Sequence, residues 1–148
     1  MSEKRQIIPV LGLLATMAMA AYMVVQLNGQ GSAATGDFRN AATAEVRDAQ
    51  GQVVLRGQFG ASDEDDDSIE RQATLESTGV DTDAAGEAEV EFENEAPSEQ
   101  EVEFSVRNLP PGAAFTLVID GVDVATVTAD ARGRAEIELD VTMPGAAQ

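Results

Sequence analysis

The sequence predicts an all-β protein, an antiparallel β-sandwich of about seven strands preceded by one N-terminal hydrophobic helix. Three observations carry this prediction. Apolar and polar residues alternate along most of the chain, turn motifs separate the alternating segments, and an uncharged apolar stretch lies near the N-terminus. Alternation with a period of two is typical of strands that are buried on one face and wet on the other.

The alternation is clearest in three segments, residues 87–93, 101–107 and 134–141. In the first, Ala88, Val90 and Phe92 alternate with glutamates, and the other two repeat this pattern. Further strands are expected over residues 43–47, 53–59, 114–119 and 122–129. The five phenylalanines lie on or beside these strands, so we expect them in the core: Phe38, Phe59, Phe92, Phe104 and Phe115.

Turn residues connect the expected strands. Asp120-Gly121 is typical of a two-residue hairpin, and it should place five apolar residues on one face, Phe115, Leu117, Ile119, Val122 and Val124. The segments 48–51 and 130–133 are near copies, each ending in a glycine suited to a left-handed position. Residues 94–100 should close another hairpin. Residues 63–83 leave two alternatives open, a short strand over 71–76 or a helical turn from Ser68.

The N-terminal segment from Ile7 to Leu27 carries no charge over 21 residues. As a helix it would be about 31 Å long, enough to cross a bilayer. Lys4 and Arg5 precede it, so the positive-inside rule places the tail in the cytoplasm and the body outside. A single-pass anchor is the favoured interpretation, and a cleaved signal peptide is the alternative. The expected organisation is a cytoplasmic tail (1–6), an anchor or signal (7–27), a flexible linker (28–36), a β-sandwich (37–143) and a tail (144–148).

Composition argues against an enzyme. After residue 34 the chain has no His, Cys, Lys, Tyr or Trp, the residue types that supply most nucleophiles and proton shuttles.

The net charge is −18, from 27 acidic and 9 basic side chains. Such a surface repels nucleic acid and attracts cations, cationic polymers and basic proteins. Acidity of this kind is also typical of salt adaptation, and the sequence leaves both explanations open. A carboxylate-only hydrolase is a remote alternative.

Two acidic features are candidate binding sites. The first is a run of five carboxylates that suits Ca²⁺, a cation that prefers oxygen ligands from loops: Asp63, Glu64, Asp65, Asp66 and Asp67. Asp81, Asp83, Asp120 and Asp123 could add ligands, although a solvated loop is the commoner role of such a run. The second is a glutamate ladder for a cationic partner: Glu89, Glu91, Glu93, Glu101 and Glu103. If these glutamates lie on adjacent strands, like charges meet across the sheet and destabilise it.

The stretch from Leu109 to Val118 (LPPGAAFTLV) resembles a corner of fibronectin type III and related immunoglobulin-like modules. Its continuation, DGVDVATVTADARGRAEIEL, is similar to small uncharacterised secreted or anchored bacterial β-sandwich proteins. The resemblance covers about a quarter of the chain. It implies an immunoglobulin-like sandwich and no catalytic residues.

Together these observations predict a non-enzymatic structural or protein-interaction module of the cell envelope, with a strongly anionic surface. It would contact the membrane through its N-terminal segment, or be secreted after cleavage, and would bind a cationic protein or polymer but no nucleic acid. A weak Ca²⁺-dependent adhesion module is the alternative, and no cofactor other than Ca²⁺ is expected. The sequence does not fix the oligomeric state.

Overall fold

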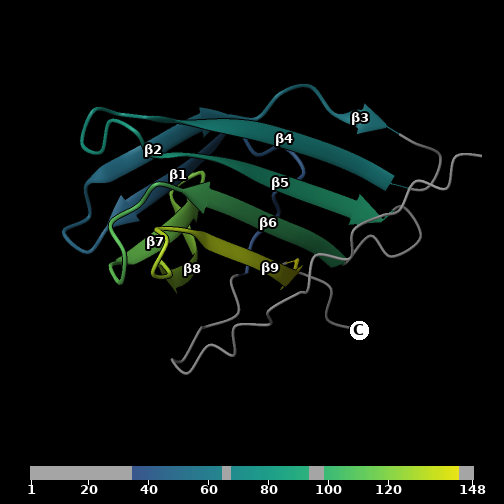
Figure 1. Ribbon diagram of the computed structural model, residues 1–148. Helices are drawn as coiled ribbons and strands as arrows, with labels where there is room; N and C mark the ends of the chain where they lie inside the picture. The colour runs from purple at the N-terminus through teal and green to yellow at the C-terminus, as the bar shows by residue number, and fades with distance from the viewer. Residues whose placement is uncertain (1–34, 65–67, 94–98, 144–148) are drawn as a thin grey trace, which may run out of the picture.

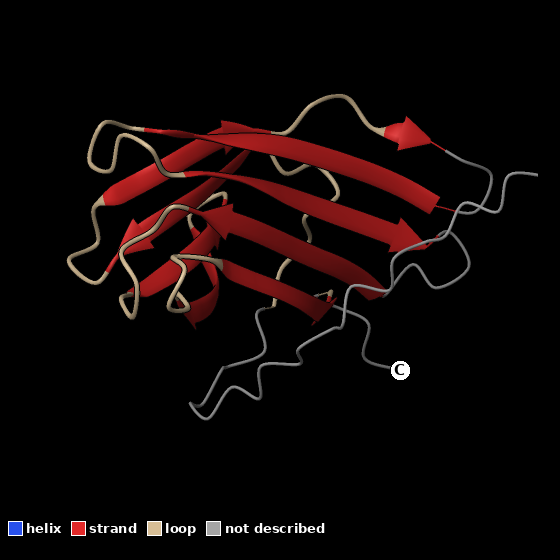
Figure 2. Cartoon of the chain, in the orientation of Figure 1, coloured by secondary structure: helices blue, strands red, loops and turns tan. Residues whose placement is uncertain are grey.

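The computed structural model describes residues 35–64, 68–93 and 99–143. This part of the chain is built from strands and connecting loops, without a helix (Figure 2). All the strand pairs are antiparallel. The prediction of an all-β antiparallel fold is therefore confirmed. The apolar segment from Ile7 to Leu27 lies outside the described residues, and within them no helix is long and apolar enough to span a bilayer.

Nine strands form one hydrogen-bonded sheet (Figure 1). They are β1 (Thr43–Asp48), β2 (Val53–Gln58), β3 (Asp63–Glu64), β4 (Ser68–Ser77), β5 (Ala85–Glu93), β6 (Glu99–Arg107), β7 (Ala114–Ile119), β8 (Val122–Thr128) and β9 (Ala135–Thr142). Their order is β8-β7-β1-β2-β4-β5-β6-β9, and β3 pairs with β4 beside this path. The sheet curls, so that β8 and β9 at its two ends contact each other. The path of hydrogen bonds is continuous, whereas the sequence predicted two packed sheets.

The concave side of the curled sheet holds one hydrophobic core. The alternation in β5 and β6 places Val90, Val102 and Phe104 on this side, and each is fully buried. β2, β4 and β7 add Leu55, Leu75 and Leu117, which are 0–1% exposed. All five phenylalanines are buried, as the sequence predicted.

The sheet has two more strands than expected because residues 63–83 contain β3 and the whole of β4. β4 begins at Ser68 and pairs with β5 from Ser68–Glu93 to Glu76–Ala85. The helical alternative at Ser68 is therefore wrong. Ala73 and Leu75 are the two inward residues of β4 that are fully buried. They are too few to give the segment a strong alternating pattern.

The turns follow the sequence closely. Asp120 and Gly121 both have positive φ, 47° and 80°, as a two-residue hairpin of this type requires. The two similar turns have the same hydrogen bonds. The Asp48 carboxylate accepts from the backbone N–H groups of Gln50 and Gln52, and the Asp130 carboxylate accepts from those of Arg132 and Arg134. The Asp48 turn closes the β1–β2 hairpin, whereas the Asp130 turn joins two strands that pair elsewhere, β8 with β7 and β9 with β6.

β8 departs from the expected pattern. Its register with β7 shifts between Leu117–Ala125 and Val118–Asp123, so Val124 forms a bulge. Val124 and Val127 are buried, whereas Val122, next to the turn, is 39% exposed. The pairing of Ile119 with Val122 puts Val122 on the same side as Phe115, as the sequence predicted, although Val122 lies beside the turn and is not buried.

Three side chains fasten the segment before β1 to the sheet. The Arg71 guanidinium donates to the carbonyls of Ala41 (2.7 Å) and Gly60 (2.9 Å) and lies 5.9 Å from the centre of the Phe59 ring. Gln100 Oε1 accepts from the Phe38 N–H at 3.0 Å. The Asp120 carboxylate accepts from the backbone N–H groups of residues 42 and 43. The Asp120 carboxylate therefore serves the fold by holding this segment to the β7–β8 turn.

Candidate functional site

The convex side of β4, β5, β6 and β9 carries aligned rows of carboxylates. One row runs across four strands as Glu70, Glu91, Glu101 and Asp140. The next row runs Gln72, Glu89, Glu103 and Glu138. We call this surface the carboxylate face, and define it by its acidic members: Glu70, Glu87, Glu89, Glu91, Glu93, Glu101, Glu103, Glu136, Glu138 and Asp140.

The strand geometry fixes the spacing of these carboxylates. Residues paired across antiparallel strands have Cβ atoms about 5 Å apart, and successive residues on one side of a strand lie about 7 Å apart. The carboxylate face is therefore a two-dimensional array rather than a converging cluster. Within the residues that the structure describes, no group of three or more acidic side chains is arranged to hold a metal ion.

Little positive charge offsets this array. The ion pairs of the described residues lie elsewhere, between Arg39 and Asp37 and between Glu45 and both Arg47 and Arg56. On the carboxylate face, Gln72 donates to Glu70 Oε1 (2.5 Å) and Glu89 Oε2 (3.1 Å). Arg107 lies beyond the array, in a row with Ala85 and Glu76. Within the described residues, the repulsion between the carboxylates is therefore screened mainly by solvent and its dissolved ions.

The pKa values of three glutamates at the centre of the face record this repulsion. Partial burial raises the pKa of Glu89, Glu101 and Glu103 above the ordinary value of 4.5, and the neighbouring carboxylates raise it further. For Glu103 those neighbours are Glu138, Glu136 and Glu87. Glu45 behaves in the opposite way. Burial alone would raise its pKa, but hydrogen bonds from Arg47 and Arg56 outweigh burial and lower it.

The structure brings the predicted glutamate ladder together. Glu89 pairs with Glu103 and Glu91 pairs with Glu101, so the expected cross-strand contacts are confirmed. Glu93 lies on the same side at the end of β5, paired with Ser68. The sequence analysis did not include the outer members of the face: Glu70, Glu136, Glu138 and Asp140. The alternation in residues 134–141 marks Glu136, Glu138 and Asp140 as outward, but only the long-range pairing of β9 with β6 shows that they extend the face. Glu70 joins it through the pairing of β4 with β5.

The acidic run has a different outcome. Asp63 and Glu64 form the short strand β3, paired with Glu70 and Ile69 of β4. Asp65, Asp66 and Asp67 lie outside the described residues. The calcium prediction for this run therefore stays a prediction.

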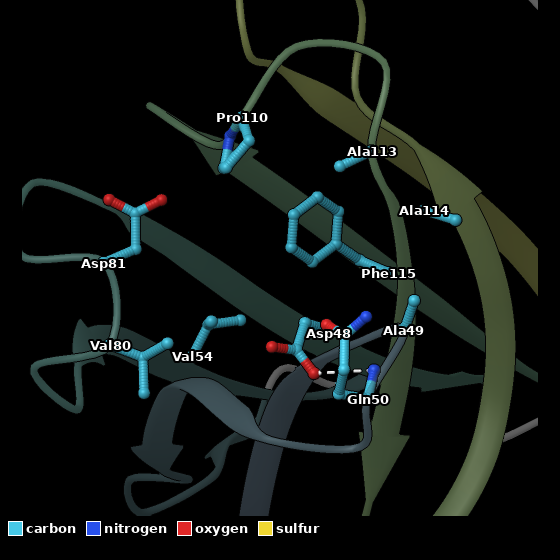
Figure 3. A pocket seen from close by; sticks show the side chains of 10 residues that line it. All are labelled: Asp48, Ala49, Gln50, Val54, Val80, Asp81, Pro110, Ala113, Ala114 and Phe115. Carbon is cyan, nitrogen blue, oxygen red and sulfur yellow. Dashed lines mark hydrogen bonds between the residues drawn. The ribbon is translucent and has the colours of Figure 1, made fainter.

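A pocket of about 330 Å³ opens at one end of the sheet (Figure 3). It lies between the Asp48 turn, the β4–β5 loop and the β6–β7 loop, and is lined by Val54, Val80, Pro110 and Phe115 among others. Two carboxylates reach it, Asp48 and Asp81, and Asp48 is already held by the backbone of its own turn (Figure 3). The lining offers apolar surface but no pair of free catalytic groups facing each other.

Comparisons with protein-family models, with curated proteins and with solved structures gave no significant match. The function is therefore argued from the geometry of the carboxylate face.

We predict that Glu103→Gln stabilises the fold at pH 7, by a few tenths to about 1 kcal/mol, the range of one unfavourable cross-strand charge pair. Because the folded-state pKa of Glu103 is raised, the wild-type chain gains stability as the pH falls from neutral towards 4.5. The advantage of the variant should therefore shrink over the same interval. Urea unfolding at a series of pH values measures both effects.

Glu45→Gln is the matched control on the same sheet. Its folded-state pKa is lowered, so its charge contributes stability that is present at neutral pH and lost in acid. This variant should be destabilised at pH 7. If Glu103→Gln is destabilised as well, the carboxylate face does not carry the repulsion described here.

Proposed function

We propose that this protein is a non-enzymatic interaction module whose carboxylate face binds a cationic protein segment or polymer. The single observation behind the proposal is the pairing of like charges across four neighbouring strands, Glu70–Glu91–Glu101–Asp140 in one row and Glu89–Glu103–Glu138 in the next. Such pairs destabilise a sheet, and a bound cation would remove the cost.

The geometry favours an extended polycation over a single metal ion. Within a row, neighbouring carboxylate side chains start about 5 Å apart, and the rows themselves are about 7 Å apart. A single ion therefore cannot be coordinated by several of them unless the strands move. Amino or guanidinium groups along a chain can instead meet many carboxylates at once. The raised pKa values of Glu89, Glu101 and Glu103 support a polycation as the partner. A raised pKa means that the charged form of the carboxylate is disfavoured, and a nearby cation would stabilise that form.

Binding of poly-L-lysine to the purified chain tests the proposal. We expect saturable binding that weakens steeply as NaCl rises through about 0.1 M, where the Debye length falls to about 10 Å. Replacing two central carboxylates, Glu89→Gln with Glu103→Gln, should weaken binding by about three- to tenfold, or roughly 1 kcal/mol. Isothermal titration calorimetry at two salt concentrations measures these changes.

The control removes the same charge elsewhere, with Asp83→Asn and Asp123→Asn, both exposed and outside the face. Equal losses in the two double variants would mean that net charge alone attracts the polymer, and would refute a defined face.

A calcium titration distinguishes the proposed function from the alternative of a Ca²⁺-dependent adhesion module. A specific site would respond to Ca²⁺ at millimolar or lower concentration where Mg²⁺ fails, whereas the face should respond equally to both.

We also propose that the sheet lies outside the cytoplasm, tethered through the segment from Ile7 to Leu27 or released after its cleavage. The support is the charge asymmetry of the sequence, with Lys4 and Arg5 before the apolar stretch and an acidic body after it. Protease added to intact spheroplasts of a bacterial host should digest the body. Full protection, with digestion only after lysis, would contradict this location.

The corner from Leu109 to Val118 supports a relation to immunoglobulin-like modules. Leu109 and Phe115 are buried, and Gly112 has a φ of 75°, so this stretch makes a tight, packed entry into β7. We propose that the curled sheet is a variant of that architecture. A crystal structure whose strands cannot be superposed on such a module would contradict it.

A further inference from the structure

The two end strands of the sheet start as neighbours and then separate. At the Asp130 turn, the Asp130 N–H donates to the Arg134 carbonyl at 2.8 Å and the Gly133 N–H donates to the Asp130 carbonyl at 3.0 Å, as in a hairpin. Beyond the turn, β8 pairs with β7 and β9 pairs with β6 (Figure 1). Across residues 35–64, 68–93 and 99–143, β9 therefore has a strand on one edge only. We call the opening along its other edge the β8–β9 seam.

The inner side of the seam is apolar and incompletely covered. Ile137 and Leu139 point to the core side of β9 but are only partly buried, whereas Ala135 and Val141, before and after them on the same side, are buried. Ala125 of β8 is partly buried as well. The middle of β9 therefore lacks the packing that a neighbouring strand gives to its inner residues. An added strand with apolar side chains on this side would cover Ile137 and Leu139.

The charge on the outer side of β9 favours one kind of partner over another. Glu136, Glu138 and Asp140 are exposed and form the last column of the carboxylate face. A second copy of this chain pairing through β9 would bring these carboxylates against each other, and like charges on an edge strand oppose such pairing. A partner with basic side chains on its outward positions would instead extend each row with a positive charge.

We propose that β9 accepts an additional strand at the β8–β9 seam, from a polypeptide in which apolar and basic residues alternate. The apolar residues pack on Ile137 and Leu139, the basic residues face Glu136, Glu138 and Asp140, and the backbone pairs with the open edge of β9. Peptide recognition by strand addition works in this way, with main-chain hydrogen bonds for affinity and alternate side chains for specificity. The inference rests on the proposed function and adds the conformation and sequence period of the cationic partner.

Three synthetic peptides of equal charge test the inference against the full chain. The first alternates lysine and valine, the second carries the same residues in two blocks, and the third is the alternating peptide with its backbone nitrogens methylated. Methylation keeps every side chain and removes every backbone donor. We expect the alternating peptide to bind about tenfold more tightly than either control, as measured by fluorescence anisotropy. Amide exchange in β9 should slow only with that peptide.

A pair of protein variants checks the position of the added strand. Glu138→Gln on β9 and Asp83→Asn in the β4–β5 loop remove the same charge from exposed places, the first beside the seam and the second outside the carboxylate face. Only Glu138→Gln should weaken the alternating peptide, by about threefold or more. Equal affinity for all three peptides, with binding retained, would overturn strand addition and leave the proposed function standing. Loss of all binding, including that of poly-L-lysine, would overturn both.

Discussion

The antiparallel register between β5 and β6 is the constraint on which the rest of the structure depends. It pairs Val90 with Val102 and Ala88 with Phe104 on the inside, and in the same step Glu89 with Glu103 and Glu91 with Glu101 on the outside. Because side chains alternate along a strand, the two sets cannot be separated, and a slip of one residue would put the glutamates into the core. The buried side therefore holds the carboxylates in rows against their mutual repulsion. β4 and β9 continue the register on either side and extend both the core and the rows.

Because one register fixes both the core and the carboxylate rows, the carboxylates affect both the stability of the sheet and its interactions. The packing of Phe104 and its buried neighbours stabilises the sheet, while the outward glutamates oppose that stability and leave a favourable interaction for a cation to make. The same charges act at the exposed edge. Glu136, Glu138 and Asp140 discourage β9 from pairing with another copy of itself, a familiar way for proteins to protect an edge strand. This distribution of charge is the reason that we propose an interaction module with a basic partner.

The sequence was most informative where structure is local. Alternation predicted β5, β6 and β9, and Asp120-Gly121 predicted the tight hairpin between β7 and β8, because these signals depend on neighbouring residues only. The pairing of strands that are distant in the sequence could not be predicted. Nothing near Glu138 says that β9 lies beside β6, so the three members of the carboxylate face on β9 were missed. Likewise, the bonds of Arg71 to Ala41 and Gly60 join distant segments. The bulge at Val124 interrupts the alternation along β8, and its position depends on the pairing of β8 with β7.

Carbon-13 NMR titration of the side-chain carboxyl groups tests the central claim most directly, because it reads each charge in the folded protein. Glu89, Glu101 and Glu103 should titrate above the ordinary glutamate pKa of 4.5, and Glu45 should titrate below it. Adding poly-L-lysine should bring the three raised values down, since a nearby cation favours the charged form. Ordinary pKa values for Glu89 and Glu103, unchanged by the polymer, would show that the carboxylates do not repel one another across β5 and β6, and would contradict this account.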